Sequence, residues 1–469
     1  MFQSFFKRLL VMIPTFLGIS LIVFFISTKT PGDPVQLLLE QKKIVIGNES
    51  SKSSLEKRMN TLREAYHFDA PLFYFKITDY TQTDTLHKIN NKSYRENLSD
   101  LSFEHGKWKA INEFNKEIDL LHTLAYGLKD VNQKNRILQF IERLKKSNNS
   151  KQLTKQLLLF KKQSITNVNI RKVFDRLESI IIAISSHNYK LNRYIPKFIW
   201  FGLNNQYHYW ISNLLTGNLG DSYVDKVPVV YKIRESARWT ILLSILSIII
   251  SYLIAVPLGV FLAKNKGSTF SEFTGTILFA IHCIPTFWMA SLLVIFFASP
   301  EYFELFPSYG LGFFGEGQSI WDKFTELSQH LVLPLICYSY SSIAYISEQT
   351  KRSIIHIDNQ NYIQTARAKG LKNLTIYRKH ILYNTSFTLI TQLGNLIPAI
   401  ISGSFVVEYI FAIPGMGKLL VDSIHYRDYP TLFATIMISS ILVMIGILIS
   451  DMLYVKFDPR VNILKDSKL

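Results

Sequence analysis

The apolar residues of this 469-residue chain are gathered into long blocks, and this distribution limits what the chain can fold into. A run of about 20 apolar residues is long enough to cross a bilayer as a helix. Runs of that kind lie near residues 9–27, 239–263, 274–298, 330–348, 386–412 and 432–455. The sequence therefore predicts an all-α polytopic membrane protein with six transmembrane helices.

The first run follows Lys7 and Arg8, as the apolar part of a signal peptide would. The apolar part of a signal peptide spans roughly 7–15 residues, however, and is followed by a small-residue cleavage motif. This run is longer and no such motif follows it. We expect an uncleaved first helix.

Basic residues near the ends of the runs predict the orientation of the chain. They alternate with turns that carry few charges, and they are Lys7, Arg8, Lys264, Lys266, the cluster from Lys351 to Lys379, Lys456 and Arg460. Cytoplasmic loops of membrane proteins are enriched in Lys and Arg, so both termini are predicted to face the cytoplasm. The same rule explains the formal net charge of +17, so this charge is not taken as a sign of nucleic-acid binding.

About 210 residues separate the first and second runs, far more than an ordinary loop needs. We expect an inserted helical extracytoplasmic domain at 76–205, between an N-terminal part (1–75) and a C-terminal core with the five remaining transmembrane helices (206–469). Apolar residues recur there at the spacing of amphipathic helices. They are Ile137, Phe140, Ile141, Leu144, Leu153, Leu157, Phe160, Val173, Leu177, Ile180 and Ile181.

Two ionisable residues, Glu408 and Asp451, fall near the ends of apolar runs. A charge inside a membrane is costly unless it is paired, so each is a candidate functional residue. A structural partner in the helix bundle is favoured over a proton relay. His282 has no second ligand at helical spacing, and no metal site is predicted.

The most informative segment is "NYIQTARAKGLKNLTIYRKHILYNTSF", between the fourth and fifth runs. Small alanines let a short helix approach a partner closely, Gly370 can end that helix in a left-handed conformation, and Leu371 offers an apolar contact. These features predict that the segment docks onto a partner protein. Its core residues are Thr365, Ala366, Arg367, Ala368, Lys369, Gly370 and Leu371.

This segment resembles the cytoplasmic loop of ABC transporter permeases of the dipeptide, oligopeptide and nickel importer family. The resemblance continues in "FFKRLLVMIPTFLGISLIVFFISTKTPGDP", in "GSFVVEYIFAIPGMGKLLVDSIHYRDYP" and in "DMLYVKFDPR". Residues from about 76 to 205 have no counterpart in the family core. Asn361 and Gln364 depart from the acidic residue and the Arg that are usual at these positions of the loop.

The resemblance implies a type I importer permease fold in the bacterial inner membrane, and import of peptides. It implies four kinds of contact: a second homologous permease, two cytoplasmic ATP-binding subunits, an extracytoplasmic substrate-binding protein and membrane lipid. The residues at 365–371 would couple the chain to the ATPases, with Arg367 and Lys369 facing an acidic rim or lipid headgroups.

No enzyme chemistry is predicted for this chain. The segment "AIPGMGKLL" contains Gly417 and Lys418, but Ala412 takes the place of the first glycine of a phosphate-binding loop and Leu419 that of its hydroxyl residue. We expect no cofactor here, with ATP and Mg bound by partner subunits. Two alternatives remain open: an ion-coupled secondary transporter, and a membrane sensor whose extracytoplasmic domain binds a ligand.

Overall fold

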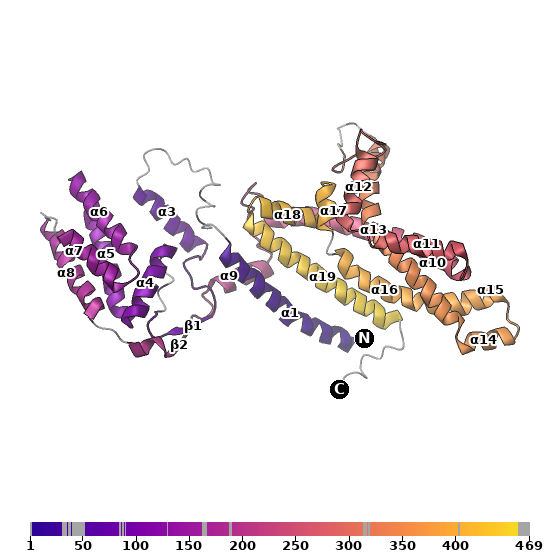
Figure 1. Ribbon diagram of the computed structural model, residues 1–469, viewed down its shortest axis with the longest axis horizontal. Coiled ribbons are helices and arrows are strands. Elements are labelled where there is room, and N and C mark those ends of the chain that lie inside the picture. The colour runs from indigo at the N-terminus through magenta and orange to yellow at the C-terminus, as the bar shows by residue number, and fades with distance from the viewer. Residues whose placement is uncertain are drawn as a thin grey trace. The chain divides into compact units, whose positions relative to one another are not determined.

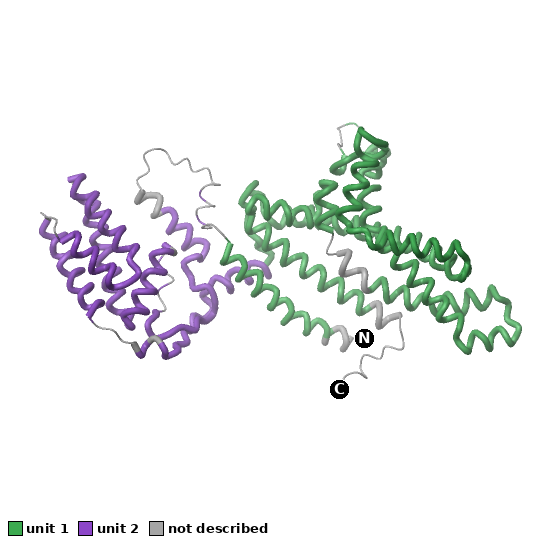
Figure 2. Tube along the Cα trace, in the orientation of Figure 1, with its two compact units in different colours: residues 1–32, 216–469 green, residues 33–215 purple. Residues whose placement is uncertain are grey.

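The computed structural model describes residues 2–30, 52–83, 91–128, 130–161, 167–186, 190–312, 319–401 and 404–457, together with residues 35, 39, 86, 89 and 317. It divides into two compact units (Figure 2), residues 1–32 with 216–469 and residues 33–215. The first unit contains the apolar runs, and the second contains the segment predicted as an insertion.

The first unit is a bundle of long helices, in which α10 packs along α13 while α1 and α16 both pack along α19 (Figure 1). Its helices are α1 (Phe2–Lys29), α10 (Val229–Lys264), α11 (Thr269–His282), α12 (Thr286–Ala298), α13 (Ile320–Asp358), α14 (Asn361–Ala368), α15 (Asn373–Ile376), the π-helical segment η3 (Tyr377–Leu382), α16 (Tyr383–Ile401), α17 (Phe405–Ile410), α18 (Met416–His425) and α19 (Tyr429–Phe457).

Three helices of the described residues are long and apolar enough to cross a membrane, namely Arg8–Lys29 within α1, Val229–Lys264 and Tyr429–Met452 within α19. The pair α11 and α12 makes a fourth if it is one broken span, bent by 98°. The run expected near 274–298 is therefore not a straight helix. Pro285 explains the bend, because it has no backbone N–H to continue a helix and it stands at the start of α12.

Neither of the two other expected spans, near 330–348 and 386–412, coincides with one separate helix. The run near 330–348 is the middle of α13, a 39-residue helix with Ser339, Ser341 and Ser342 in that stretch. The run near 386–412 is divided between α16 and α17, and residues 402 and 403 lie outside the described residues. The chain is thus a mostly helical membrane protein with three or four candidate spans in its described part.

Small residues on one side of α10 let this helix lie close to α13. Ser251, Ala255 and Gly259 recur every four residues and are buried. A Cβ atom added to Gly259 would lie 2.5 Å from the carbonyl oxygen of Ser347 and 2.5 Å from Cβ of Thr350. Membrane helices pack through such small residues because the two backbones then make extensive van der Waals contact.

The second unit is a bundle of short amphipathic helices that bury one apolar side each. It contains α3 (Lys52–Ala65), α4 (Lys92–His105), α5 (Trp108–Tyr126), α6 (Val131–Lys145), α7 (Ser150–Lys161), α8 (Val168–Ser186), the 3-10 turn η2 (Lys190–Arg193) and α9 (Gln206–Leu215). The core is formed by α4 to α8. Every core position predicted from helical spacing is buried except Ile180, which is partly buried.

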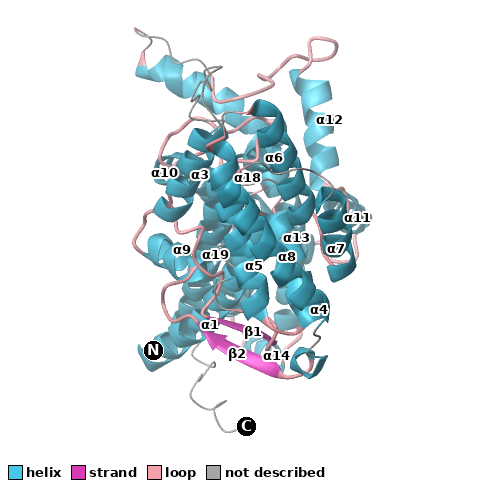
Figure 3. Ribbon diagram, turned by 90° about the vertical axis from the view of Figure 1, so that its left-hand side faces the viewer, coloured by secondary structure: helices cyan, strands magenta, loops and turns pink. Residues whose placement is uncertain are grey.

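Two short strands, β1 (Phe75–Asp79) and β2 (Pro196–Trp200), form an antiparallel ribbon in this unit, drawn in magenta in Figure 3. Phe75 pairs with Trp200, and Asp79 pairs with Pro196. The strands stand before and after α4 to α8 in the chain. The expected all-α fold did not include this ribbon, because pairing between segments so far apart in sequence leaves no local pattern.

Candidate functional site

The residues predicted to couple the chain to an ATPase lie on α14 and the turn after it. Ile363 and Ala366 are buried on one side of α14. They belong to an apolar cluster that also contains Ala263 from α10, together with Ile354 and Ile357 from α13. One side of α14 is therefore attached to the ends of the two helices that pack along each other in the bundle.

Gly370 ends α14 in the left-handed conformation that the sequence predicted, with a φ of 76°. The N–H of Gly370 donates to the carbonyl of Arg367 at 2.9 Å, and the N–H of Leu371 donates to that of Ala366 at 3.3 Å. These bonds satisfy carbonyls at the helix end. A side chain at position 370 would be strained, because residues other than glycine rarely adopt this φ.

The other side of α14 and its turn is open to solvent. The exposed members of the predicted set are Thr365, Arg367, Ala368, Lys369, Gly370 and Leu371. Arg367 forms an ion pair with Asp358 at 2.6 Å. The two alanines therefore differ: Ala366 belongs to the core of the chain itself, and Ala368 is exposed.

Glu408, on α17, is completely buried. Its Oε1 accepts hydrogen bonds from the hydroxyls of Thr240 at 2.7 Å and Tyr338 at 2.9 Å. Its Oε2 accepts from the backbone N–H groups of Gly417 at 2.6 Å and Lys418 at 3.3 Å. All four partners donate, which matches an ionised carboxylate. The charge is thus balanced by the N-terminus of α18 and two hydroxyls.

This carboxylate explains the two glycines at the start of α18. A Cβ atom on Gly415 would collide with the carboxylate of Glu408, and one on Gly417 would collide with the backbone of Phe405. Gly415 itself offers no side chain to cap α18. Glu408 caps α18 from a different helix. The backbone N–H groups of Gly417 and Lys418, in "PGMGK", are the groups that donate to it.

Asp428 is a second buried carboxylate, which sequence reasoning did not single out. It lies just before α19 and accepts hydrogen bonds from the hydroxyls of Ser222 at 2.5 Å and Thr431 at 2.6 Å, and from the N–H of Tyr223 at 2.9 Å. The Nζ of Lys232 lies 3.5 Å from it. These hydrogen bonds and the ion pair connect the segment before α10 to the start of α19.

The same lysine also binds Asp225, at 2.9 Å. Burial favours a higher pKa for Asp225, but hydrogen bonds from Lys232, Ser222 and the backbone of Val227 outweigh it and lower the pKa below its usual value. Asp225 therefore stays charged at neutral pH. This second ion pair holds Lys232 beside Asp428.

Asp451 lies near the end of α19 and forms an ion pair with Arg8 of α1. Both side chains are partly exposed, so the pair is expected to add little stability by itself. The sequence analysis used Arg8 as a flanking basic residue and did not predict its pairing with Asp451. Among the described residues no group of three or more His, Cys, Asp or Glu could hold a metal ion, and His282 lies 2.9 Å from the hydroxyl of Ser341.

Residues 255–463, which include α14, Glu408 and Asp428, match the family described as "Binding-protein-dependent transport system inner membrane component". The oligopeptide transport system permease protein AppB of Bacillus subtilis is 37% identical over 273 residues, which cover 56% of this chain and 83% of AppB. The chain belongs to this permease family. It is the membrane-spanning permease subunit of an ATP-driven importer.

Other relatives agree with this assignment. The dipeptide transport system permease protein DppB of Bacillus subtilis is 33% identical to this permease over 262 residues, covering 55% of the permease and 80% of DppB. A chain of the MetNI methionine ABC transporter, solved in inward-facing conformations, aligns with a TM-score of 0.39 and 16% identity, covering 49% of this permease and 98% of that chain. The assignment rests on the sequence relatives, and it favours an importer over an ion-coupled carrier or a sensor.

Proposed function

We propose that this permease imports peptides across the bacterial inner membrane. The similarity to permeases named for oligopeptides and dipeptides supports this substrate class. The permease pairs with a second homologous permease and works with two cytoplasmic ATP-binding subunits and an extracytoplasmic binding protein. ATP and Mg are bound by the ATP-binding subunits, and this chain needs no cofactor of its own.

In this proposal the chain crosses the membrane six times, with both termini in the cytoplasm. The spans are α1, α10, the bent pair α11 and α12, α13, α16 with α17, and α19. Basic residues gather at the ends that this topology places in the cytoplasm, which include α14 and its turn. The segment from 76 to 205 then lies outside the cytoplasm.

The architecture of α14 is the observation that supports coupling most directly. Ile363 and Ala366 attach one side of the helix to the ends of α10 and α13. The opposite side presents Ala368 and Leu371 to solvent. An ATPase docked on the exposed side would therefore move α10 and α13 when it closes on ATP, because the apolar cluster links them.

Isolation of the permease from its native membrane tests the proposed assembly. A pair of ATP-hydrolysing subunits and a second permease should co-purify with it in mild detergent. An oligomer of this chain alone would contradict the proposal.

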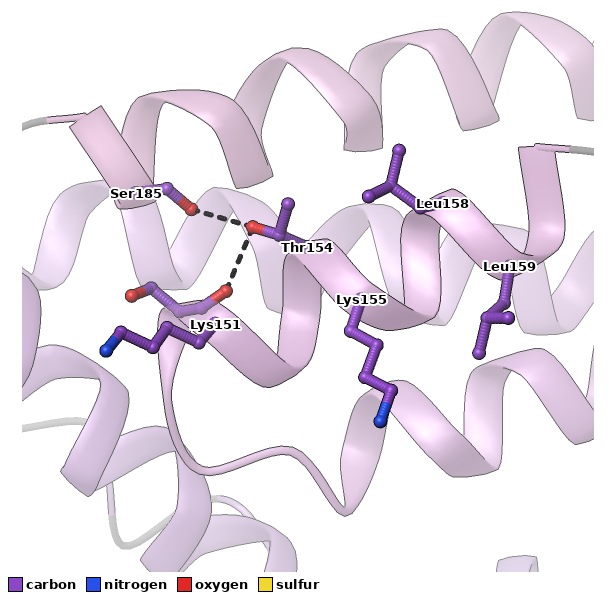
Figure 4. A pocket seen from close by; sticks show the side chains of 7 residues that line it. Lys151, Thr154, Lys155, Leu158, Leu159 and Ser185 are labelled. Atoms are coloured by element: carbon purple, nitrogen blue, oxygen red, sulfur yellow. Dashed lines mark hydrogen bonds between the residues drawn. The ribbon is translucent and has the colours of Figure 1, made fainter.

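We propose that the second unit, with its helices α4 to α8, is a docking surface for the binding protein; we call it the helical unit. An open groove lies on α7 and α8, lined by Ser150, Lys151, Thr154, Lys155, Leu158, Leu159 and Ser185 (Figure 4). In the groove Thr154 Oγ1 lies 3.1 Å from Ser185 Oγ, while Lys151 and Lys155 bring positive charge. Exposed leucines beside lysines suit a protein partner with an acidic rim.

The ribbon allows this role to be tested by a clean deletion. Asp79 and Pro196 are the last paired residues of β1 and β2, so an Asn-Gly turn can replace residues 80–195 and leave a hairpin. We expect the shortened permease to insert and to bind its ATPases. A higher concentration of binding protein should be needed for half-maximal stimulation of ATP hydrolysis, because docking surface has been lost.

The control is the same replacement tested without binding protein, where basal ATP hydrolysis should match that of the full chain. An unchanged concentration dependence would show that the helical unit does not take part in docking.

A further inference from the structure

One face of the ribbon exposes large apolar side chains. Side chains alternate along a strand and paired residues lie side by side, so this face carries Phe75, Ile77, Phe198 and Trp200. Their exposed fractions are 39%, 70%, 61% and 63%. The rings of Phe75 and Phe198 stack with centroids 5.5 Å apart. We call these four residues the aromatic face.

The aromatic face does not build the core of its unit. Packing comes from the other side of the ribbon, where Ile199 is buried and Lys76 donates a hydrogen bond to Gln82 at 2.7 Å. Further exposed apolar residues precede and follow β2 in the chain, namely Leu191, Tyr194, Ile195 and Leu203. Large apolar side chains gathered on one exposed face indicate an interaction surface, whereas single exposed ones are ordinary.

We propose that the aromatic face lies in the headgroup region of the bilayer that the chain's own helices span. Trp is enriched in this region because its large apolar ring carries a polar N–H group, and Phe side chains enter the same boundary from the apolar side of interfacial elements. None of the four residues of the aromatic face is charged. The last pair on the same side of the ribbon is Asp79 with Pro196, and Asp79 accepts a hydrogen bond from the N–H of Thr81 at 2.8 Å. Lys197 alternates with residues of the aromatic face along β2 and can extend toward lipid phosphates.

Two properties of the chain favour lipid over a protein as the occupant. After β2 the chain passes through α9 and enters a candidate membrane span at Val229, so residues 201–228 connect the ribbon to a membrane helix. The helical unit also carries more Lys and Arg than Asp and Glu, and this excess attracts it to anionic lipid. Contact through the ribbon would hold the α4 to α8 bundle against the membrane surface, which limits its orientations toward a docking partner.

The test uses full-length permease in proteoliposomes that contain anionic phospholipid. Ile77→Cys is labelled with an environment-sensitive fluorophore, and Ile182→Cys on α8 is the matched control, since Ile182 is 53% exposed. Cys283 is exposed and is replaced by Ser, whereas Cys337 is buried. Phe198→Cys is a second site on the aromatic face. Quenching is measured with lipid that carries a nitroxide near its headgroup, and separately with aqueous iodide.

The fluorophores at positions 77 and 198 should be quenched by the nitroxide lipid about twofold more than the one at 182, with the reverse order for iodide. Iodide quenching equal to that at 182 would overturn the proposal, because the face would then lie in water. Protection from both quenchers would also overturn it, since protein would cover the face. The nitroxide lipid is present in both leaflets, so the result does not depend on the proposed topology. Binding protein is left out, so the result does not depend on the proposed docking role.

Discussion

Replacing Glu408 by Met should strongly destabilise the permease, by at least about 3 kcal/mol of unfolding free energy, because each buried donor left without its acceptor costs about 1–3 kcal/mol. The hydroxyls of Thr240 and Tyr338 and the N–H groups of Gly417 and Lys418 would lose their acceptor in a closed interior. Chemical unfolding in detergent, followed by circular dichroism, measures the change.

Glu408→Gln should have a smaller effect, about 1–3 kcal/mol. Its amide oxygen can still accept from the N–H groups of α18, but its NH2 group must then face the hydroxyls of Thr240 and Tyr338. Those hydroxyls already accept from the N–H groups of Met416 and Ser404.

Glu348→Met is the matched control for both variants. Glu348 lies on α13 and pairs only with Arg352 at the surface, so less than about 1 kcal/mol should be lost. If Glu408→Met unfolds as the wild type does, the carboxylate is not the cap that holds α17 and α18 together.

Placing Arg at Ala368 should uncouple ATP hydrolysis from the loaded binding protein without unfolding the permease. Ala368 is exposed on α14, so a long side chain fits in the isolated chain. In a docked complex it would meet the ATPase where close packing is required, and a penalty of about 1.4 kcal/mol or more lowers the docked population tenfold. Binding-protein-stimulated ATP hydrolysis in proteoliposomes should therefore fall by at least about tenfold.

Ala183→Arg is the control, because Ala183 is also an exposed alanine on a helix, α8, but lies in the other unit. Ala366→Arg gives a useful contrast. Ala366 is buried in the cluster with Ile363, so this change should lower the thermal midpoint as well as activity. Wild-type stimulation in the Ala368→Arg variant would show that α14 is not the docking element.

The parts of the structure that follow from local pattern could be predicted from the sequence. The spacing of Ile137, Phe140, Ile141 and Leu144 sets one buried stripe on α6, and the structure buries all four. Gly370 could be predicted as a helix terminator, since glycine adopts a positive φ without strain. The loop with residues 365–371 could be recognised because its local sequence resembles the cytoplasmic loop of the permease family.

Contacts between distant segments could not be predicted in this way. Glu408 was recognised as a charge that needs a partner, yet Thr240 and Tyr338 stand 168 and 70 residues away along the chain. The available signal was the Gly-Met-Gly turn, which leaves room for a carboxylate. The pairing of Phe75 with Trp200 could not be predicted for the same reason, because the two residues are far apart in the sequence.

The difference between Ala366 and Ala368 also depends on tertiary packing. Both are small residues on one short helix, and the sequence gives no reason to separate them. The side of α14 that faces the cluster is set by Ile363 together with the ends of α10 and α13. The coupling role itself remains a proposal.

The central claim is that this chain forms the pathway of an ATP-driven peptide importer. Proteoliposomes that contain the permease pair and its ATPases should be mixed with binding protein and a radiolabelled peptide on the outside. The peptide should accumulate inside only when ATP is enclosed in the vesicles, and the Ala368→Arg variant should abolish that accumulation. Uptake without ATP that follows an imposed proton or sodium gradient would contradict the account and indicate an ion-coupled carrier.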